Sequence, residues 1–225
     1  MFIIETHLHT KYISHCGWLT AEELLSDYAA AGYHGICVTD HYNRRCFDYA
    51  GIDLNTDESL TEAFLLGVRK MQELAADYGI RIYEGAELRF DENDNDYLLY
   101  GFNHDLLAHP DAVIKSGLAD FYPRAQAAGA LLIQAHPFRP GCSPAPAEYL
   151  DGLEVLNTNP RHQNNNDLAL AYAIEHSLIQ ISGSDCHRPG DAAKTGIISS
   201  YLPADSREFA ALLRSGEFDM IEEKA

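Results

Sequence analysis

Short apolar stretches alternate with helix-like stretches along most of the 225-residue chain. The short stretches have the length and the flanking turn residues of buried strands. Strands are predicted at Met1–Ile4, Gly35–Thr39, Ile80–Glu87, Asp96–Phe102, Ala130–Gln134, Gly152–Leu156, Ile179–Ser182 and Thr195–Ser199. Helices are predicted at Thr20–Ala31, Leu60–Tyr78, Ala119–Ala128, Asn165–His176 and Ser206–Ser215. This alternation, with short links, predicts a parallel sheet that is either open or closed.

Capping and turn residues mark several of the predicted helix ends. Thr20 is followed three residues later by Glu23, which is the pattern of a capping box, and Asp205 can cap the last helix. Glycines follow three predicted helices, at positions 32, 79 and 129, where a helix commonly ends. The segments Tyr42–Ser59 and Arg139–Glu148 are irregular, and the second is predicted to be a surface loop.

Length and composition are those of one globular domain, which we place at residues 1–225. The hydrophobic fraction is 46%, and single barrel domains commonly reach this length. No apolar run is long enough for a membrane span, and the amino terminus is predicted to be a strand rather than a signal peptide. Five scattered cysteines without a CxxC pattern favour a reducing, cytoplasmic location without disulfides. The sequence does not indicate an oligomeric state.

The formal net charge of −18 narrows the range of partners. Binding to duplex nucleic acid needs a basic surface, so duplex nucleic acid is not expected as a partner. An acidic protein also repels an anionic substrate, unless the substrate pocket is locally positive. Bound divalent metal ions would supply that local positive charge.

Histidine, aspartate or glutamate stands at the end of almost every predicted strand. His7 and His9 lie two residues apart after the first strand, so both side chains project from one face. The other such residues are Asp40, His41, Glu87, His104, His136, Asp185 and His187, with His15 in the loop after the first strand. The strand ends of a parallel β/α barrel meet on one face. Because buried imidazoles and carboxylates need partners, this arrangement predicts a site for divalent zinc, manganese or iron.

The motifs around these residues resemble those of the polymerase-and-histidinol-phosphatase (PHP) superfamily. They are HLHT near the start, VTDH after the second strand, the glutamate of GAE, then AHP, and SGSDCH near the end. Each motif is short, but the five occur in the order of the family between His7 and about Gly196. The resemblance implies an α/β fold, a distorted (β/α)7 TIM-like barrel, with up to three divalent metal ions and hydrolysis of phosphoesters.

The resemblance also implies a set of metal ligands. One ion would be held by His7, His9, Glu87 and Asp185. A second would share Glu87 as a bridge and add His104 and His136, with His109 as the competitor of His104. A third would be held by His15, His41 and His187. The sequence SHCGWLTAEEL departs from the Ser-Asp-Gly of many family phosphatases, and its His15 resembles the three-metal subgroup.

Such a site would activate a water molecule for in-line attack on phosphorus. The catalytic candidates are Asp40, Glu87 and Asp185. Asp40 would orient a ligand histidine or serve as an acid or base. Arginine is suited to binding phosphate because its planar guanidinium forms paired hydrogen bonds. The candidates for this role are Arg139, Arg161, Arg44 and Arg45.

The leading functional hypothesis is a phosphoesterase that hydrolyses a small phosphate monoester. A histidinol-phosphate phosphatase is a specific alternative, although this chain leaves little room for substrate-capping insertions. A metal-dependent hydrolase of amides or cyclic esters would use the same activated water. A non-catalytic regulatory domain is the third class, and the full ligand set argues against it.

Overall fold

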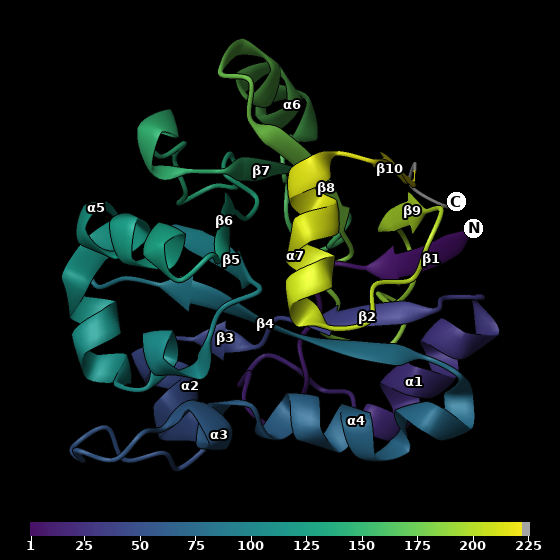
Figure 1. Ribbon diagram of the computed structural model, residues 1–225, viewed down its shortest axis with the longest axis horizontal. Helices are drawn as coiled ribbons and strands as arrows, with labels where there is room; N and C mark the ends of the chain where they lie inside the picture. Colours follow the sequence, from purple (N-terminus) through teal and green to yellow (C-terminus); the bar gives the residue numbers. More distant parts are fainter. Residues whose placement is uncertain (222–225) are drawn as a thin grey trace.

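A ring of seven strands organises residues 1–221, which the computed structural model describes. The ring strands are β1 (Phe2–Glu5), β2 (Gly35–Val38), β4 (Arg81–Arg89), β5 (Asp96–Tyr100), β6 (Leu131–Gln134), β7 (Gly152–Asn157) and β8 (Ile179–Gly183). They are paired in this order. The segments after β1 and β8 also meet, because Leu8 bridges Cys186 and the amide of Asp185 donates to the carbonyl of His7 at 2.9 Å. The sheet is therefore a nearly closed, distorted barrel, as predicted (Figure 1).

Strand direction differs from the prediction of a parallel sheet. β1, β2 and β4 run parallel, as do β6, β7 and β8, but β5 runs antiparallel to both β4 and β6. Only residues 90–95 separate β4 from β5, and a parallel crossover needs a dozen or more residues. The outer strands β9 (Ile197–Ser199) and β10 (Phe218–Met220) are also antiparallel, and the short β3 (His41–Tyr42) pairs with β4.

The helices occur largely where the sequence predicts them. They are α1 (Ala21–Ala30), α2 (Arg44–Tyr49), α3 (Thr61–Phe64), α4 (Leu66–Tyr78), α5 (Pro110–Ala127), α6 (Asn166–Glu175) and α7 (Ser206–Ser215), with 3-10 turns at His104–Leu107 and Ala147–Tyr149. Thr20 and Glu23 form the expected capping box. Two differences are α2, which lies in the segment expected to be irregular, and α5, which begins nine residues earlier than predicted and is interrupted at Gly117.

Helix α7 closes the end of the barrel where the parallel strands begin. It packs against β4, β5 and β8, and it lies across the ring of strands in Figure 1. Phe209 of this helix stacks on Tyr83 with ring centroids 4.8 Å apart. Leu212 and Leu213 of the same helix are fully buried. The opposite end of the barrel, at the carboxyl ends of the parallel strands, remains for a functional site.

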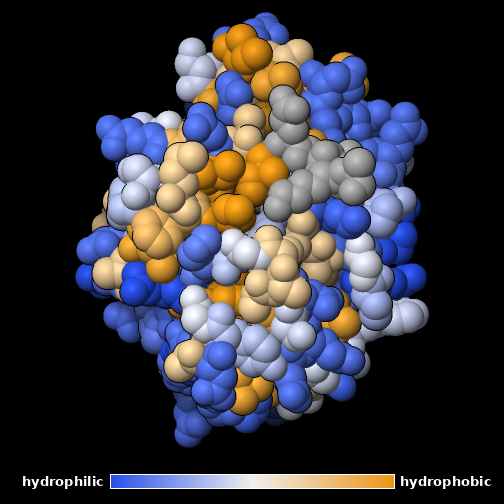
Figure 2. All heavy atoms as spheres, turned by 90° about the vertical axis from the view of Figure 1, so that its right-hand side faces the viewer, coloured by the Kyte–Doolittle hydropathy of each residue, from blue (hydrophilic) through white to orange (hydrophobic). Residues whose placement is uncertain are grey.

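The surface is mostly polar, with apolar side chains in a few places. Helix α6 exposes Leu168, Leu170 and Ile174, and Figure 2 shows apolar side chains at the top of the molecule, where Figure 1 places this helix. Within the described residues, no helix combines the length and the apolar character needed to cross a membrane. All five cysteines are free thiols.

Candidate metal centre

The carboxyl ends of the parallel strands bring four predicted ligands together. His7 and His9 follow β1, Glu87 lies near the end of β4, and Asp185 follows β8. The Nε2 atoms of the two histidines are 3.1 Å apart. The Glu87 carboxylate lies 3.3 Å from each of them, and Asp185 Oδ1 lies 3.3 Å from His9 Nε2 and 3.5 Å from His7 Nε2. All four side chains are buried.

Neighbouring side chains fix which nitrogen of each histidine faces the centre. His7 Nδ1 donates to Glu154 Oε1 at 2.8 Å. The Ser14 hydroxyl donates a hydrogen bond to Asp40 at 2.7 Å. The same hydroxyl oxygen therefore accepts from His9 Nδ1 at 3.2 Å. Each ring therefore has its Nδ1 engaged and turns its Nε2 toward the other. Two imidazole nitrogens that converge with two buried carboxylates form a donor set that fits a metal ion.

Glu87 contacts imidazoles with both carboxylate oxygens. Oε1 lies 3.1 Å from His136 Nε2, while Oε2 lies 2.6 Å from His41 Nδ1. Despite that short distance, the Oε2 and Nδ1 atoms do not meet in hydrogen-bond geometry, and both are buried polar atoms without a hydrogen-bond partner. Burial raises the pKa of Glu87, but the charges of His41 and His7 outweigh it and hold the pKa well below its usual value. An ionised, buried carboxylate oxygen that accepts no hydrogen bond is a ready metal ligand.

At the second predicted metal position, the structure brings only one of the two predicted histidines to the centre. His136 lies beside Glu87 as expected, but His104 is 44% exposed and pairs with Glu84 at 2.9 Å. The reason is the direction of β5, whose end lies toward the start of β4. The start of β5 instead places Asp96 at the centre. The Asp96 carboxylate forms a candidate ligand group with His41 and Glu87. The structure therefore does not bring His104 to the centre.

His109, the competitor of His104, is exposed at the start of α5 and belongs to none of the ligand groups formed by the described residues.

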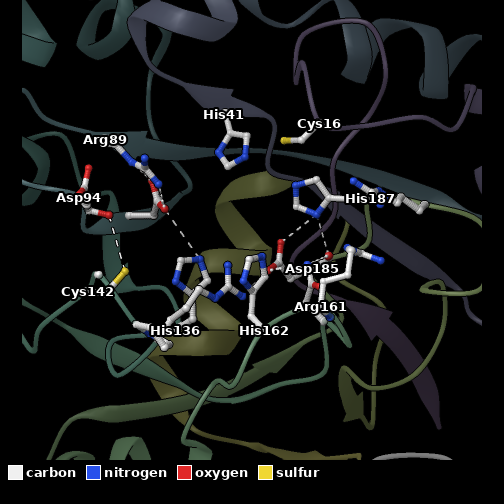
Figure 3. A pocket seen from close by; sticks show the side chains of 16 residues that line it. Cys16, His41, Arg89, Asp94, His136, Cys142, Arg161, His162, Asp185 and His187 are labelled. Carbon is white, nitrogen blue, oxygen red and sulfur yellow. Dashed lines mark hydrogen bonds and ion pairs between the residues drawn. The ribbon is translucent and has the colours of Figure 1, made fainter.

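The third predicted position also differs from the sequence-based assignment. His9, His41 and His187 form a ligand group, and the His9 ring stacks on the other two at centroid distances of 4.3 and 4.1 Å. His15 is turned away from this group and places its Nδ1 3.3 Å from the sulfur of Cys46. The neighbouring Cys16 points into the cavity beside His41 and His187 (Figure 3). Burial raises the pKa of this thiol, but hydrogen bonds with His187 and His41 lower it to about 6.

Backbone strain coincides with two of the predicted ligands. His136 and Asp185 have φ angles of +30° and +50°, in the left-handed region that residues other than glycine seldom adopt. Such conformations persist where surrounding contacts impose them, and they concentrate at functional sites. Here the amide of His136 donates to Glu154 and the amide of Asp185 donates to the carbonyl of His7. Glu154 thus fixes the backbone at His136 and also the side chain of His7.

Asp40 is buried as a positioning group and does not belong to the described residues that line the cavity. Its two carboxylate oxygens accept from the amide and hydroxyl of Thr10 and from the hydroxyl of Ser14, each at 2.7 Å. Because Ser14 contacts His9, Asp40 holds this histidine indirectly. The contacts favour the orienting role over the acid or base role.

A cavity of about 510 Å³ opens beside the ligand cluster (Figure 3). Its lining includes four arginines, namely Arg89, Arg139, Arg161 and Arg188. Arg139 lies 2.6 Å from Asp185, and Arg161 pairs through two hydrogen bonds with Asp191. The Arg188 guanidinium lies 4.3 Å above the ring of Trp18, and its buried Nε has no hydrogen-bond partner.

The structure separates the other two predicted arginines from this cavity. Arg44 is held by Asp91 at 2.9 Å and Asp111 at 2.7 Å. Arg44 and Arg45 line a neighbouring hollow of about 250 Å³, which His15 and His41 also line.

Several residues of the site escape sequence reasoning. Glu154 lies inside the apolar strand β7, where the alternation of side chains gives no sign of its role. Asp96 stands at the beginning of a strand rather than at its end. Arg89 follows the predicted ligand Glu87 by two residues, and Arg188 follows His187 directly. This proximity in the sequence could have indicated that both arginines lie near the site.

The sequence of residues 5–212 matches the family model of the PHP domain. The chain belongs to the PHP domain family. This PHP domain superimposes on a two-domain protein from Bacteroides vulgatus ATCC 8482, described as containing a predicted PHP-like metal-dependent phosphoesterase. The TM-score is 0.70 at 16% identity, covering 99% of this chain and 65% of that protein, so the PHP domain spans just under two thirds of its length.

Two further solved structures share the barrel. PsfC from Pseudomonas syringae PB-5123 superimposes with a TM-score of 0.64 at 16% identity, over 93% of this chain and 88% of that one. An amidohydrolase from Chromobacterium violaceum, with bound sulfate and no metal, superimposes with a TM-score of 0.51 at 16% identity. The superposition covers 84% of this chain and 88% of that one. At this low identity, the superpositions show that the fold is shared. No curated protein matches the chain significantly.

Proposed function

We propose that this PHP domain is a metal-dependent phosphoesterase that hydrolyses a small phosphate monoester. Two or three divalent ions, of zinc, manganese or iron, would bind at the carboxyl end of the barrel. The observation that carries the proposal is the orientation of His7 and His9. Their Nδ1 protons are engaged elsewhere, and their Nε2 atoms converge on the carboxylates of Glu87 and Asp185.

We assign the ligands from the contacts among the described residues. The first group is His7, His9, Glu87 and Asp185. The second is His136, Glu87 and Asp96, next to His41. The third is His9, His41 and His187, with Cys16 or His15 nearby. Glu87 takes part in the first two, so it would bridge two ions.

The protein's own groups position the reactants. Bound divalent ions lower the pKa of a coordinated water and offset the charge of a phosphate. Arg161 and Arg188 line the cavity beside the ligands and would bind phosphate oxygens, while Arg139 holds the carboxylate of Asp185 from the same side. His162, which also lines the cavity, would contact the remainder of the substrate.

The structural relatives support the hydrolase class. One relative is described as a predicted metal-dependent phosphoesterase, and another binds sulfate, an anion shaped like phosphate. That second relative is called an amidohydrolase, and amide hydrolysis would need the same activated water. Amides therefore belong in the substrate panel as the main competing class.

The decisive experiment combines elemental analysis with a substrate panel on one sample. We expect two or three divalent ions per chain after reconstitution, and turnover of at least one phosphate monoester that stops when a chelator is added. Turnover confined to amides or cyclic esters would reassign the substrate class. Absence of bound metal after reconstitution would overturn the proposal.

A further inference from the structure

The loop after β1 carries a thiol where the sequence predicts an imidazole ligand. His15 and Cys16 are adjacent, so the conformation of the loop decides which side chain enters the cavity. His15 turns toward Cys46, whereas Cys16 lines the cavity. In Figure 3 its sulfur points toward His41, and the ring of His187 lies below it.

Backbone contacts hold the loop in this orientation. The amide of Gly17 donates to the carbonyl of Ser14 at 2.9 Å, and the amide of Trp18 donates to the carbonyl of His187 at 2.8 Å. A side chain at Gly17 would place its Cβ 2.5 Å from the carbonyl oxygen of Thr10, so only glycine allows this close approach. The loop is therefore tied directly to the segment that carries His187.

The two imidazoles beside Cys16 are suitably prepared for a cation. His187 Nδ1 donates to the carbonyl of Asp185 at 2.9 Å, which leaves its Nε2 for a partner in the cavity. His41 faces Glu87, whose fully buried Oε2 has no hydrogen-bond partner. An unsatisfied buried carboxylate oxygen next to two imidazoles and a thiol is an arrangement that a metal ion would satisfy.

We propose that Cys16, rather than His15, is a ligand of the third metal position, together with His41 and His187. Coordination needs the thiolate, so metal binding would release the thiol proton to solvent. A thiolate with two imidazoles selects zinc over manganese, whereas carboxylate-rich positions suit manganese. The third position would therefore be a zinc site beside a less selective pair. This inference rests on the proposed metal-dependent function.

Cobalt provides a direct probe of a sulfur ligand. Metal-free protein would be loaded with Co²⁺ under inert gas, and the near-ultraviolet absorption of thiolate-to-cobalt charge transfer would be recorded. We expect the band in the wild-type protein and in the matched control Cys142→Ser, because Cys142 lines the same cavity away from His187. We expect Cys16→Ser to lose the band and to retain one zinc ion fewer per chain after dialysis.

Two further variants distinguish the ligand from its neighbour. His15→Ala should keep both the band and the zinc content. Cys16→Asp supplies an oxygen ligand, so it should recover the third ion without the band and should bind manganese there more readily than the wild type. This recovery would also show that the loop folds without the thiol.

Three results would overturn the inference. They are a wild-type protein that binds cobalt without a thiolate band, a band that persists in Cys16→Ser, and loss of the third ion in His15→Ala but not in Cys16→Ser. Each of these leaves the proposed hydrolase intact, because metal still binds. A wild-type protein that takes up no metal would overturn both proposals.

Discussion

At the scale of single residues, the site depends on side chains that hold the ligands. Glu154 contacts His7 Nδ1 with one oxygen, and its other oxygen accepts from the amide of His136 and from Asn157. Ser14 performs the same task for His9. Groups of this kind set the tautomer and direction of a ligand, and their loss commonly weakens metal binding by about 10–100-fold.

The first prediction concerns Glu154→Gln. The amide can accept at one atom only, so its NH₂ group would face either His7 Nδ1 or the donors from His136 and Asn157. We expect metal affinity to fall by about 10–100-fold with the fold retained, as measured by metal titration and circular dichroism. Glu148→Gln, in the surface turn before β7, is the matched control. Unchanged affinity in Glu154→Gln would mean that His7 is oriented by other contacts.

The second prediction concerns Glu87→Gln. A bridging carboxylate serves two ions, so its loss should lower the metal content and the hydrolysis rate together. We expect activity to fall by more than about tenfold, roughly 1.4 kcal/mol in the barrier. Activity on the best substrate that remains within this limit would show that Glu87 does not bridge. His136→Ala, which removes a ligand of one proposed ion, provides the comparison.

At the scale of elements, the sequence predicts positions well and directions poorly. Apolar stretches located the seven ring strands, and the capping box located the start of α1. The period-two pattern of a strand carries no information about its direction, so β5 was expected to run parallel. Loops have no periodicity at all, and nothing in SHCG indicates whether His15 or Cys16 turns inward. Both differences between the predicted ligand set and the arrangement in the structure arise from these gaps.

The third prediction tests the direction of β5 through its two ends. Asp96 stands at the start of the strand beside the ligand cluster, and His104 follows its end on the far side. Asp96→Asn should lose metal from the position shared by Glu87 and His136, and activity should fall with it. His104→Ala should keep the wild-type metal content, as measured by elemental analysis. The reverse pattern would restore His104 as a ligand.

At the scale of the whole molecule, the cavity beside the ligand cluster gathers several positive side chains on an otherwise acidic protein. The chain carries a formal charge of −18, yet four arginines line the cavity of about 510 Å³. Three of them already have carboxylate partners, namely Asp96, Asp185 and Asp191. Such pairs hold the guanidinium groups in place but offset much of their charge. A phosphate would therefore depend on bound metal ions and on the cation with free hydrogen-bond donors.

The fourth prediction follows from this distribution of charge. Arg188 has an unpartnered Nε beside the cavity, so it should contribute most of the side-chain attraction for phosphate. A hydrogen bond between charged groups contributes about 1.5–3 kcal/mol, which is roughly a tenfold to hundredfold change in affinity. We expect Arg188→Ala to keep its metal content and to raise the inhibition constant of inorganic phosphate by at least about tenfold. Arg161→Ala should act in the same direction.

Arg44→Ala is the matched control, because Arg44 is held by Asp91 and Asp111 outside the cavity. The inhibition constant of phosphate for this variant should stay at the wild-type value. If phosphate inhibits Arg188→Ala and the wild type equally, the anion is bound by the metal ions and by other residues. If Arg44→Ala alone loses inhibition, the substrate enters through the neighbouring hollow, and that hollow is the phosphate site.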